Sequence, residues 1–193
     1  MSLSEKLCKC VQKLLNKSRY QHSLAVAETA KKLADHWGED PQKAELAGFL
    51  HDLGRSYDAH EYIDLCQKYG LKVSQRERCN PILLHAPLGA YMAEKELGIA
   101  DTDILEAIAY HTLGKIGMSD LAKIIFLADV IEPGRQWKDT ETLKELRKVA
   151  YEDLNLVVGK ALDGIFNWLL ECGREIPLED YQTRDYFYAL AKK

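Results

Sequence analysis

The residues Ala47-Gly-Phe-Leu-His-Asp-Leu-Gly-Arg-Ser-Tyr57 place a histidine and an aspartate side by side in an apolar segment of helical character. The helix that carries them is expected to begin at Asp40-Pro41, an N-cap aspartate followed by proline at the first helical position, and to stop at Gly54. A buried polar group without a partner costs about 1–3 kcal/mol, and an isolated charge costs more. The pair His51-Asp52 therefore needs a partner that neutralises it.

The rest of the chain repeats its apolar residues with the period of a helix, and no segment alternates convincingly as a strand. The fold class is therefore predicted to be all-α. The last long helical stretch is expected to be interrupted at Gly159 or Gly164. The expected helices cover, approximately, residues 3–16, 18–37, 41–54, 57–69, 85–97, 101–111, 120–131, 140–172 and 177–190.

Composition narrows the class of protein. The chain has 193 residues, of which 47% are hydrophobic and 29% are charged, as is ordinary for a globular domain. The net charge is −4 and no long basic run occurs, so neither a nucleic acid nor a membrane surface is expected as a partner. No apolar run has the roughly 18 residues of a membrane span, and no signal-peptide core is seen, which favours a cytoplasmic location. The five cysteines are scattered and predict free thiols.

Six polar side chains, the pair His51-Asp52 among them, lie on or beside apolar helical faces, where polar groups are unusual. Asp129 is the clearest case, since it shares a helix face with Leu121 and Ile125. Six unsatisfied groups would cost ~6–18 kcal/mol, as much as the ~5–15 kcal/mol net stability of a typical domain. These groups could satisfy one another, but imidazoles and carboxylates that converge from several helices are typical of a metal site. The six are His22, His51, Asp52, His85, His111 and Asp129.

The order of these residues resembles the HD superfamily of metal-dependent phosphohydrolases. The motifs around them are similar to one bacterial branch, the symmetrical bis(5'-nucleosyl)-tetraphosphatases, or diadenosine tetraphosphate hydrolases, which are also labelled HD hydrolases involved in NAD metabolism. The resemblance covers about residues 15–137. It implies an HD-domain helical bundle with a helical C-terminal extension, as a single domain over 1–193 with a metal-site core at about 18–135 and a cover at about 138–193. The motifs are Arg19-Tyr-Gln-His-Ser23, Leu50-His-Asp-Leu-Gly-Arg55, Leu84-His-Ala-Pro-Leu-Gly-Ala90, Tyr110-His-Thr-Leu-Gly114 and Ala128-Asp-Val-Ile-Glu-Pro-Gly-Arg135.

The resemblance also implies two divalent metal ions. It assigns His22, His51, Asp52 and Asp129 to one ion, and His85, His111 and the other oxygen of Asp52 to the second. Asp52 would thus be the shared, catalytic ligand. Adjacent residues on a helix point about 100° apart, which lets His51 hold one ion while Asp52 reaches between two. Iron is favoured by the resemblance, although manganese, cobalt, nickel or zinc suit the same ligands. The expected reaction is symmetrical hydrolysis of diadenosine tetraphosphate to two ADP by a metal-bridging hydroxide.

The polyphosphate of such a substrate needs further positive charge. Arg135 is expected to bind phosphate through its bidentate fork and to act in catalysis, and Arg19 and Lys115 are further candidates for substrate binding. Thr112 is expected to donate its hydroxyl to a phosphate oxygen. Two positions depart from the family pattern, because Arg55 stands where a lysine is expected and Leu113 where a hydroxyl is expected.

Other interpretations stay open at this point. The chain could act on another nucleotide, such as a nucleoside di- or triphosphate or an alarmone, or it could be a nucleotide-sensing binding module. His36 and His60 lie outside the pattern and are predicted to be surface residues. The aromatic residues of 181–188 could stack on a base, but helix packing is favoured. The partner is expected to be a small nucleotide, and the C-terminal helices could supply a homodimer face.

Overall fold

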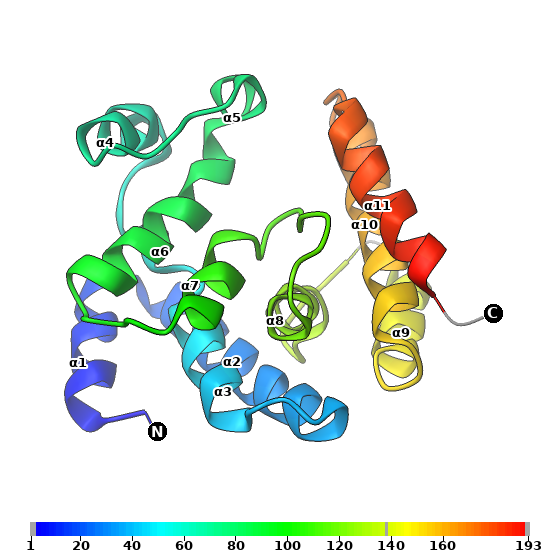
Figure 1. Ribbon diagram of the computed structural model, residues 1–193, viewed down its shortest axis with the longest axis horizontal. Coiled ribbons are helices and arrows are strands. Elements are labelled where there is room, and N and C mark those ends of the chain that lie inside the picture. The colour runs from blue at the N-terminus through cyan, green and yellow to red at the C-terminus, as the bar shows by residue number, and fades with distance from the viewer. Residues whose placement is uncertain (1–2, 138, 192–193) are drawn as a thin grey trace.

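The computed structural model describes residues 3–137 and 139–191, and within them all regular structure is helical, which confirms the predicted fold class (Figure 1). No helix among these residues is long and apolar enough to cross a bilayer. The α-helices are α1 (Glu5–Leu14), α2 (Lys17–Trp37), α3 (Pro41–Leu50), α4 (Tyr62–Lys68), α5 (Gln75–Cys79), α6 (His85–Lys95), α7 (Thr102–Ala109), α8 (Asp120–Ile131), α9 (Thr140–Val149), α10 (Leu154–Glu171) and α11 (Leu178–Leu190). Three short 3₁₀ turns are η1 (Leu53–Ser56), η2 (Ala59–Glu61) and η3 (Pro81–Leu84).

The central element is α8, which begins at the N-cap Ser119. Residues 121–128 are all buried, because α8 packs against α2, α3 and α7 on one side and against α10 on the other. Figure 1 shows α8 between the N-terminal helices and a C-terminal layer of α9, α10 and α11. A helix that is apolar all round is typical of such an enclosed position.

The helix before the pair His51-Asp52 is shorter than the sequence predicts. It ends at Leu50, so the pair forms the turn into η1 instead of continuing the helix to Gly54. The turn is needed because η1 packs closely on the start of α6. A Cβ on Gly54 would lie 2.1 Å from the backbone oxygen of His85, so glycine is required at this contact. The contact fixes the His-Asp pair beside His85.

The predicted interruption at Gly159 or Gly164 is wrong. Both glycines lie inside α10, where each makes room for an aromatic ring from a neighbouring segment. The chain breaks instead at 150–153, between α9 and α10, where the Asp153 carboxylate accepts hydrogen bonds from two backbone amides of the first turn of α10. A capping aspartate thus decides the boundary that the glycines were expected to set.

Hydrogen bonds attach the C-terminal layer to the end of α8. The guanidinium of Arg147 on α9 donates to the backbone oxygens of Ile131, at 2.9 Å, and Glu132, at 2.8 Å. These bonds satisfy carbonyl groups that the end of a helix otherwise leaves free. They hold the layer next to the helix that carries Asp129, in line with the proposed organisation of a core and a cover within one domain.

Candidate metal centre

The structure brings together all six side chains that the sequence analysis selected. His22 comes from α2, His51 and Asp52 from the turn after α3, His85 from the start of α6, His111 from the turn after α7, and Asp129 from α8. Two overlapping groups each place one ligand atom per residue within 4.8 Å of the others. The first group contains His22, His51 and Asp129, and the second contains His51, Asp52 and His111.

Backbone hydrogen bonds orient three of the four histidines in the same way. In His51, His85 and His111, Nδ1 lies against the carbonyl oxygen three residues earlier in the chain, at 2.7 Å for His51 and His111. A carbonyl oxygen only accepts, so Nδ1 donates the proton and Nε2 keeps its lone pair. Since Nε2 is the nitrogen that faces the cluster, the three imidazoles present the form that binds a metal.

The contacts among these lone pairs fit a divalent cation. Nε2 of His85 lies 3.1 Å from Nε2 of His111, and no hydrogen bond joins two acceptors. Two nitrogens that bind one ion at about 2.1 Å and at right angles would be about 3 Å apart. Nε2 of His51 is buried and has no hydrogen-bond partner among the described residues. Burial lowers the pKa of His111 to about 4 and that of His85 well below its usual value, so both imidazoles are neutral at pH 7.

The two carboxylate oxygens of Asp52 face different histidines. Oδ1 lies 3.4 Å from Nε2 of His85 and 3.9 Å from Nε2 of His111, whereas Oδ2 lies 3.7 Å from Nε2 of His51. Burial disfavours the charged form of Asp52, but the positive charges around it, that of Arg55 among them, outweigh burial and hold its pKa well below the usual value. The carboxylate is therefore ionised and placed to contact two ions at once.

Asp129 occupies the other side of the cluster. Its Oδ1 lies 2.9 Å from Nε2 of His22, 3.8 Å from Nε2 of His51 and 2.7 Å from the guanidinium of Arg135. Burial raises its pKa, but the bond from His22 and the charge of Arg135 outweigh burial and lower the pKa far below the usual value. A charged carboxylate thus interrupts the buried apolar run of α8.

Glu132, which the sequence analysis did not select as a site residue, lies against a candidate ligand in the structure. His22 differs from the other histidines, because its Nδ1 lies 3.2 Å from Oε1 of Glu132 and not against a carbonyl oxygen. Glu132 is buried, and its other oxygen accepts the backbone N–H of Gly134. A carboxylate behind an imidazole is the arrangement that orients metal ligands. The sequence signals for Glu132 are its position three residues after Asp129 and its place in the motif of residues 128–135.

Three arginines surround the carboxylates of the cluster. The guanidinium of Arg19 lies 2.9 Å from Oδ2 of Asp52, Nε of Arg55 lies 3.3 Å from Oδ1 of the same residue, and Arg135 contacts Asp129. The position of Arg55 was noted only as a departure from the family pattern, yet its side chain reaches the centre.

The expected substrate-binding residues fall into two groups. Thr112, Arg19 and Arg135 line the cleft at the cluster. Lys115 is not among the lining residues, because its ammonium group lies 3.5 Å from Glu106 and 4.5 Å from the centre of the Tyr110 ring. His36 and His60 are exposed, as predicted.

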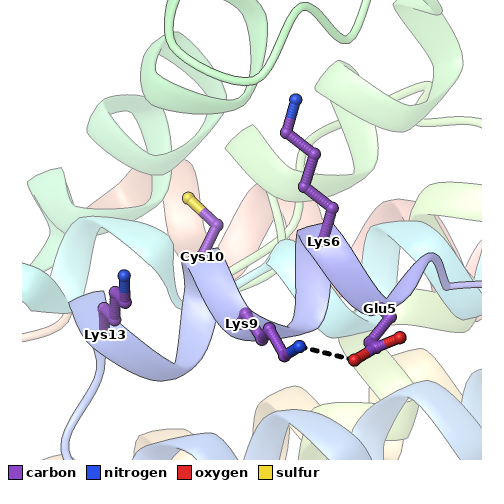
Figure 2. A pocket seen from close by; sticks show the side chains of 5 residues that line it. All are labelled: Glu5, Lys6, Lys9, Cys10 and Lys13. Atoms are coloured by element: carbon purple, nitrogen blue, oxygen red, sulfur yellow. Dashed lines mark hydrogen bonds and ion pairs between the residues drawn. The ribbon is translucent and has the colours of Figure 1, made fainter.

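The cluster opens into a cleft of about 940 Å³, which is large enough for a nucleotide. The cleft is lined by Asp52, His85, His111 and Asp129 and by residues of the segment after α8, of α9 and of α10. A second hollow, of about 500 Å³, lies on α1 and is lined by Glu5, Lys6, Lys9, Cys10 and Lys13 (Figure 2). All five come from one short helix and none belongs to the cluster, so the cleft at the cluster is the candidate site.

The all-helical fold and the cluster of four imidazoles and two carboxylates define a metal-dependent phosphohydrolase of the HD type. The sequence matches the HD domain over residues 19–134, and the chain belongs to the HD-domain family. The resemblance stated from the motifs is thereby confirmed.

Within this family, the chain is similar over nearly its whole length to proteins of one named activity. It is 42% identical to the symmetrical bis(5'-nucleosyl)-tetraphosphatase of Halalkalibacterium halodurans, over 89% of each chain. The enzyme of the same name from Bacillus subtilis is 34% identical, over 94% of this chain and 96% of the relative. A crystal structure of a predicted HD superfamily hydrolase involved in NAD metabolism, from Clostridium acetobutylicum, is 36% identical, with a TM-score of 0.90 over 98% of this chain and 100% of the other.

Proposed function

We propose that this chain hydrolyses diadenosine tetraphosphate symmetrically to two ADP at a centre of two divalent metal ions. The observation that carries the proposal is the orientation of the two Asp52 carboxylate oxygens. One oxygen faces His85 and His111, and the other faces His51. The activity named for the two relatives, which align over nearly the whole chain, supports the choice of substrate.

The donor set would hold the ions in two groups that share Asp52. When bound, the ions would supply Lewis acidity toward the phosphate oxygens and lower the pKa of a water molecule toward neutrality. We favour iron; manganese, cobalt, nickel and zinc accept the same imidazole and carboxylate ligands. The first group is His22, His51, Asp52 and Asp129, and the second is His85, His111 and Asp52.

The residues around the ligands would bind the polyphosphate. Arg19, Arg55 and Arg135 place three guanidinium groups at the cluster end of the cleft, where each can donate two parallel hydrogen bonds to a phosphate group. Thr112 lines the same end and would donate its hydroxyl to a phosphate oxygen. Arg135 would in addition offset the charge that develops on the phosphoryl group under attack. Lys115 lies outside this lining, and a substrate role for it stays a prediction.

A nucleotide panel with product analysis tests the proposal. Metal-loaded protein should convert diadenosine tetraphosphate to ADP alone, and production of AMP with ATP would refute symmetrical cleavage. Faster hydrolysis of a nucleoside di- or triphosphate or an alarmone would establish the second interpretation, an HD phosphohydrolase with another substrate. Tight binding without turnover of any nucleotide would establish a sensing module.

Metal analysis of protein purified without chelator tests the number of ions. The proposal requires close to two first-row metals per chain, and one ion with no second site would refute the binuclear centre. A homodimer through the C-terminal helices stays a prediction, which analytical ultracentrifugation checks. A cytoplasmic location also stays a prediction.

A further inference from the structure

The cleft has two ends of different chemistry. Four candidate ligands, Asp52, His85, His111 and Asp129, line the cleft together with the three arginines, and we call this part the inner end. We call the part lined by Gln136, Trp137, Asp139 and residues of α9 and α10 the outer end. Among the described residues of the outer end, the charged groups are four carboxylates and one lysine, Asp139, Glu145, Lys160, Asp163 and Glu171. Lys160 lies 2.6 Å from the carboxylate of Glu145, and Asp163 lies 3.0 Å from the guanidinium of Arg184, so the lysine is paired and two of the four carboxylates take part in ion pairs. Phosphate groups are attracted to the inner end, and the outer end suits a part of the ligand that is neutral.

An aromatic ring is fixed at this outer end. Trp137 is partly buried and lines the cleft, and its benzene edge rests directly on Gly164 of α10. A Cβ on Gly164 would lie 2.3 Å from Cζ3 and 2.7 Å from Cη2 of this ring, so only glycine leaves room for it. Trp137 follows Arg135 by two residues, which limits their Cα separation to about 7 Å. A ring that borders the cleft is thus held one short chain segment away from an arginine of the metal centre.

We propose that Trp137, seated on Gly164, is the stacking platform for the base of a bound nucleotide whose phosphates lie at the metal centre. The proposal rests on the proposed function only in taking a nucleotide as the ligand. A base is flat and uncharged, and stacking on an aromatic side chain is worth about 1–3 kcal/mol per base.

Binding of two ligands that differ by the nucleoside tests the platform. The affinities of ADP and of inorganic pyrophosphate would be measured by titration calorimetry on the full, metal-containing chain. Trp137→Ala should weaken ADP binding by about 5- to 150-fold, the equivalent of 1–3 kcal/mol, and leave pyrophosphate binding and metal content unchanged. Trp137→Phe, which keeps a ring, should retain most of the affinity for ADP.

A double-mutant cycle tests whether the contact with Gly164 of α10 holds the Trp137 ring in place. Gly164→Ala should weaken ADP binding, because the added methyl group displaces the indole ring. The same substitution should have no further effect in the Trp137→Ala background, since there is no ring left to displace. Additive effects would show that Gly164 acts independently of the ring and would overturn the seat.

Three results would overturn the proposal as a whole. The first is that the wild type does not bind ADP, and the second is that Trp137→Ala binds ADP with unchanged affinity. The third is that Trp137→Ala weakens the binding of ADP and of pyrophosphate equally, which would mean that the ring stabilises the metal centre and does not bind the base. Failure of the proposed function is distinguishable from these results. If the protein does not cleave diadenosine tetraphosphate but Trp137→Ala weakens ADP binding, the stacking proposal stands and the proposed function fails. If the protein cleaves it to ADP but Trp137→Ala has no effect on ADP binding, the proposed function stands and the stacking proposal fails.

Discussion

Removing the carboxylate of Glu132 should weaken metal binding without unfolding the protein. Glu132 is buried, contacts Nδ1 of His22 at 3.2 Å and holds that imidazole so that Nε2 faces Asp129. Without it, His22 loses the hydrogen-bond partner that orients its imidazole. Loss of such a partner typically lowers metal affinity by 10- to 100-fold, or about 1.4–2.7 kcal/mol. Glu132→Ala should lower the metal affinity by an amount within this range.

The assay is competition for the metal against a chelator of known affinity, with circular dichroism to verify that the variants fold. Glu132→Gln should fall between the wild type and Glu132→Ala, because the amide oxygen still accepts a hydrogen bond but carries no charge. Glu141→Gln is the matched control, since Glu141 is an exposed carboxylate that pairs with Lys144 and touches no candidate ligand. If Glu132→Ala binds metal within about twofold of the wild type, His22 needs no carboxylate partner and the argument is wrong.

Three further predictions concern the reaction and the stability of the fold. Asp52→Ala should abolish turnover and lower the metal content, because it removes the shared ligand; near-normal turnover would exclude that role. Arg135→Ala should lower kcat/KM by about 10- to 150-fold, the loss of one charge-assisted hydrogen bond, with the metal content intact. Burial raises the pKa of Asp180 to about 6 from 3.8, against the opposing charge of Arg76. The pKa of Asp180 is higher in the folded chain than in the unfolded chain, so the protonated carboxyl stabilises the fold fully below about pH 4. As the pH rises through 6 this contribution is lost, and the free energy of unfolding falls by about 3 kcal/mol. Urea unfolding of wild type and Asp180→Asn across this range checks the difference, and equal pH dependence would contradict it.

The candidate ligands were predictable because each carries its own local signal. Asp129 stands in an aliphatic run, and His51-Asp52 stands in an apolar segment, so both violate the pattern of the helix around them. The all-α class followed from the same periodicity. The position of the pair was less predictable, because the helix ends at Leu50 and the following turn packs Gly54 against the backbone of His85, a contact between distant residues that the sequence does not show.

Features that depend on distant partners were not predictable. Glu132 acts on His22, which lies 110 residues away, and Gly164 was interpreted as a break because the sequence does not show the ring of Trp137 against it. Conversely, Lys115 follows His111 closely in sequence but turns toward Glu106, away from the cleft. Proximity along the chain does not give the direction in which a side chain points.

The ligand set joins five elements spread between His22 and Asp129, so an ion bound there would act as a cross-link. It would close a long loop of the unfolded chain, in the way that a disulfide does in a secreted protein, whereas all five cysteines here are free thiols. An ion at about 100 times its dissociation constant would add about 2.7 kcal/mol to the free energy of unfolding. The free energy of unfolding would then depend on the supply of metal, and scarcity of the ion would lower the stability of the fold as well as the activity.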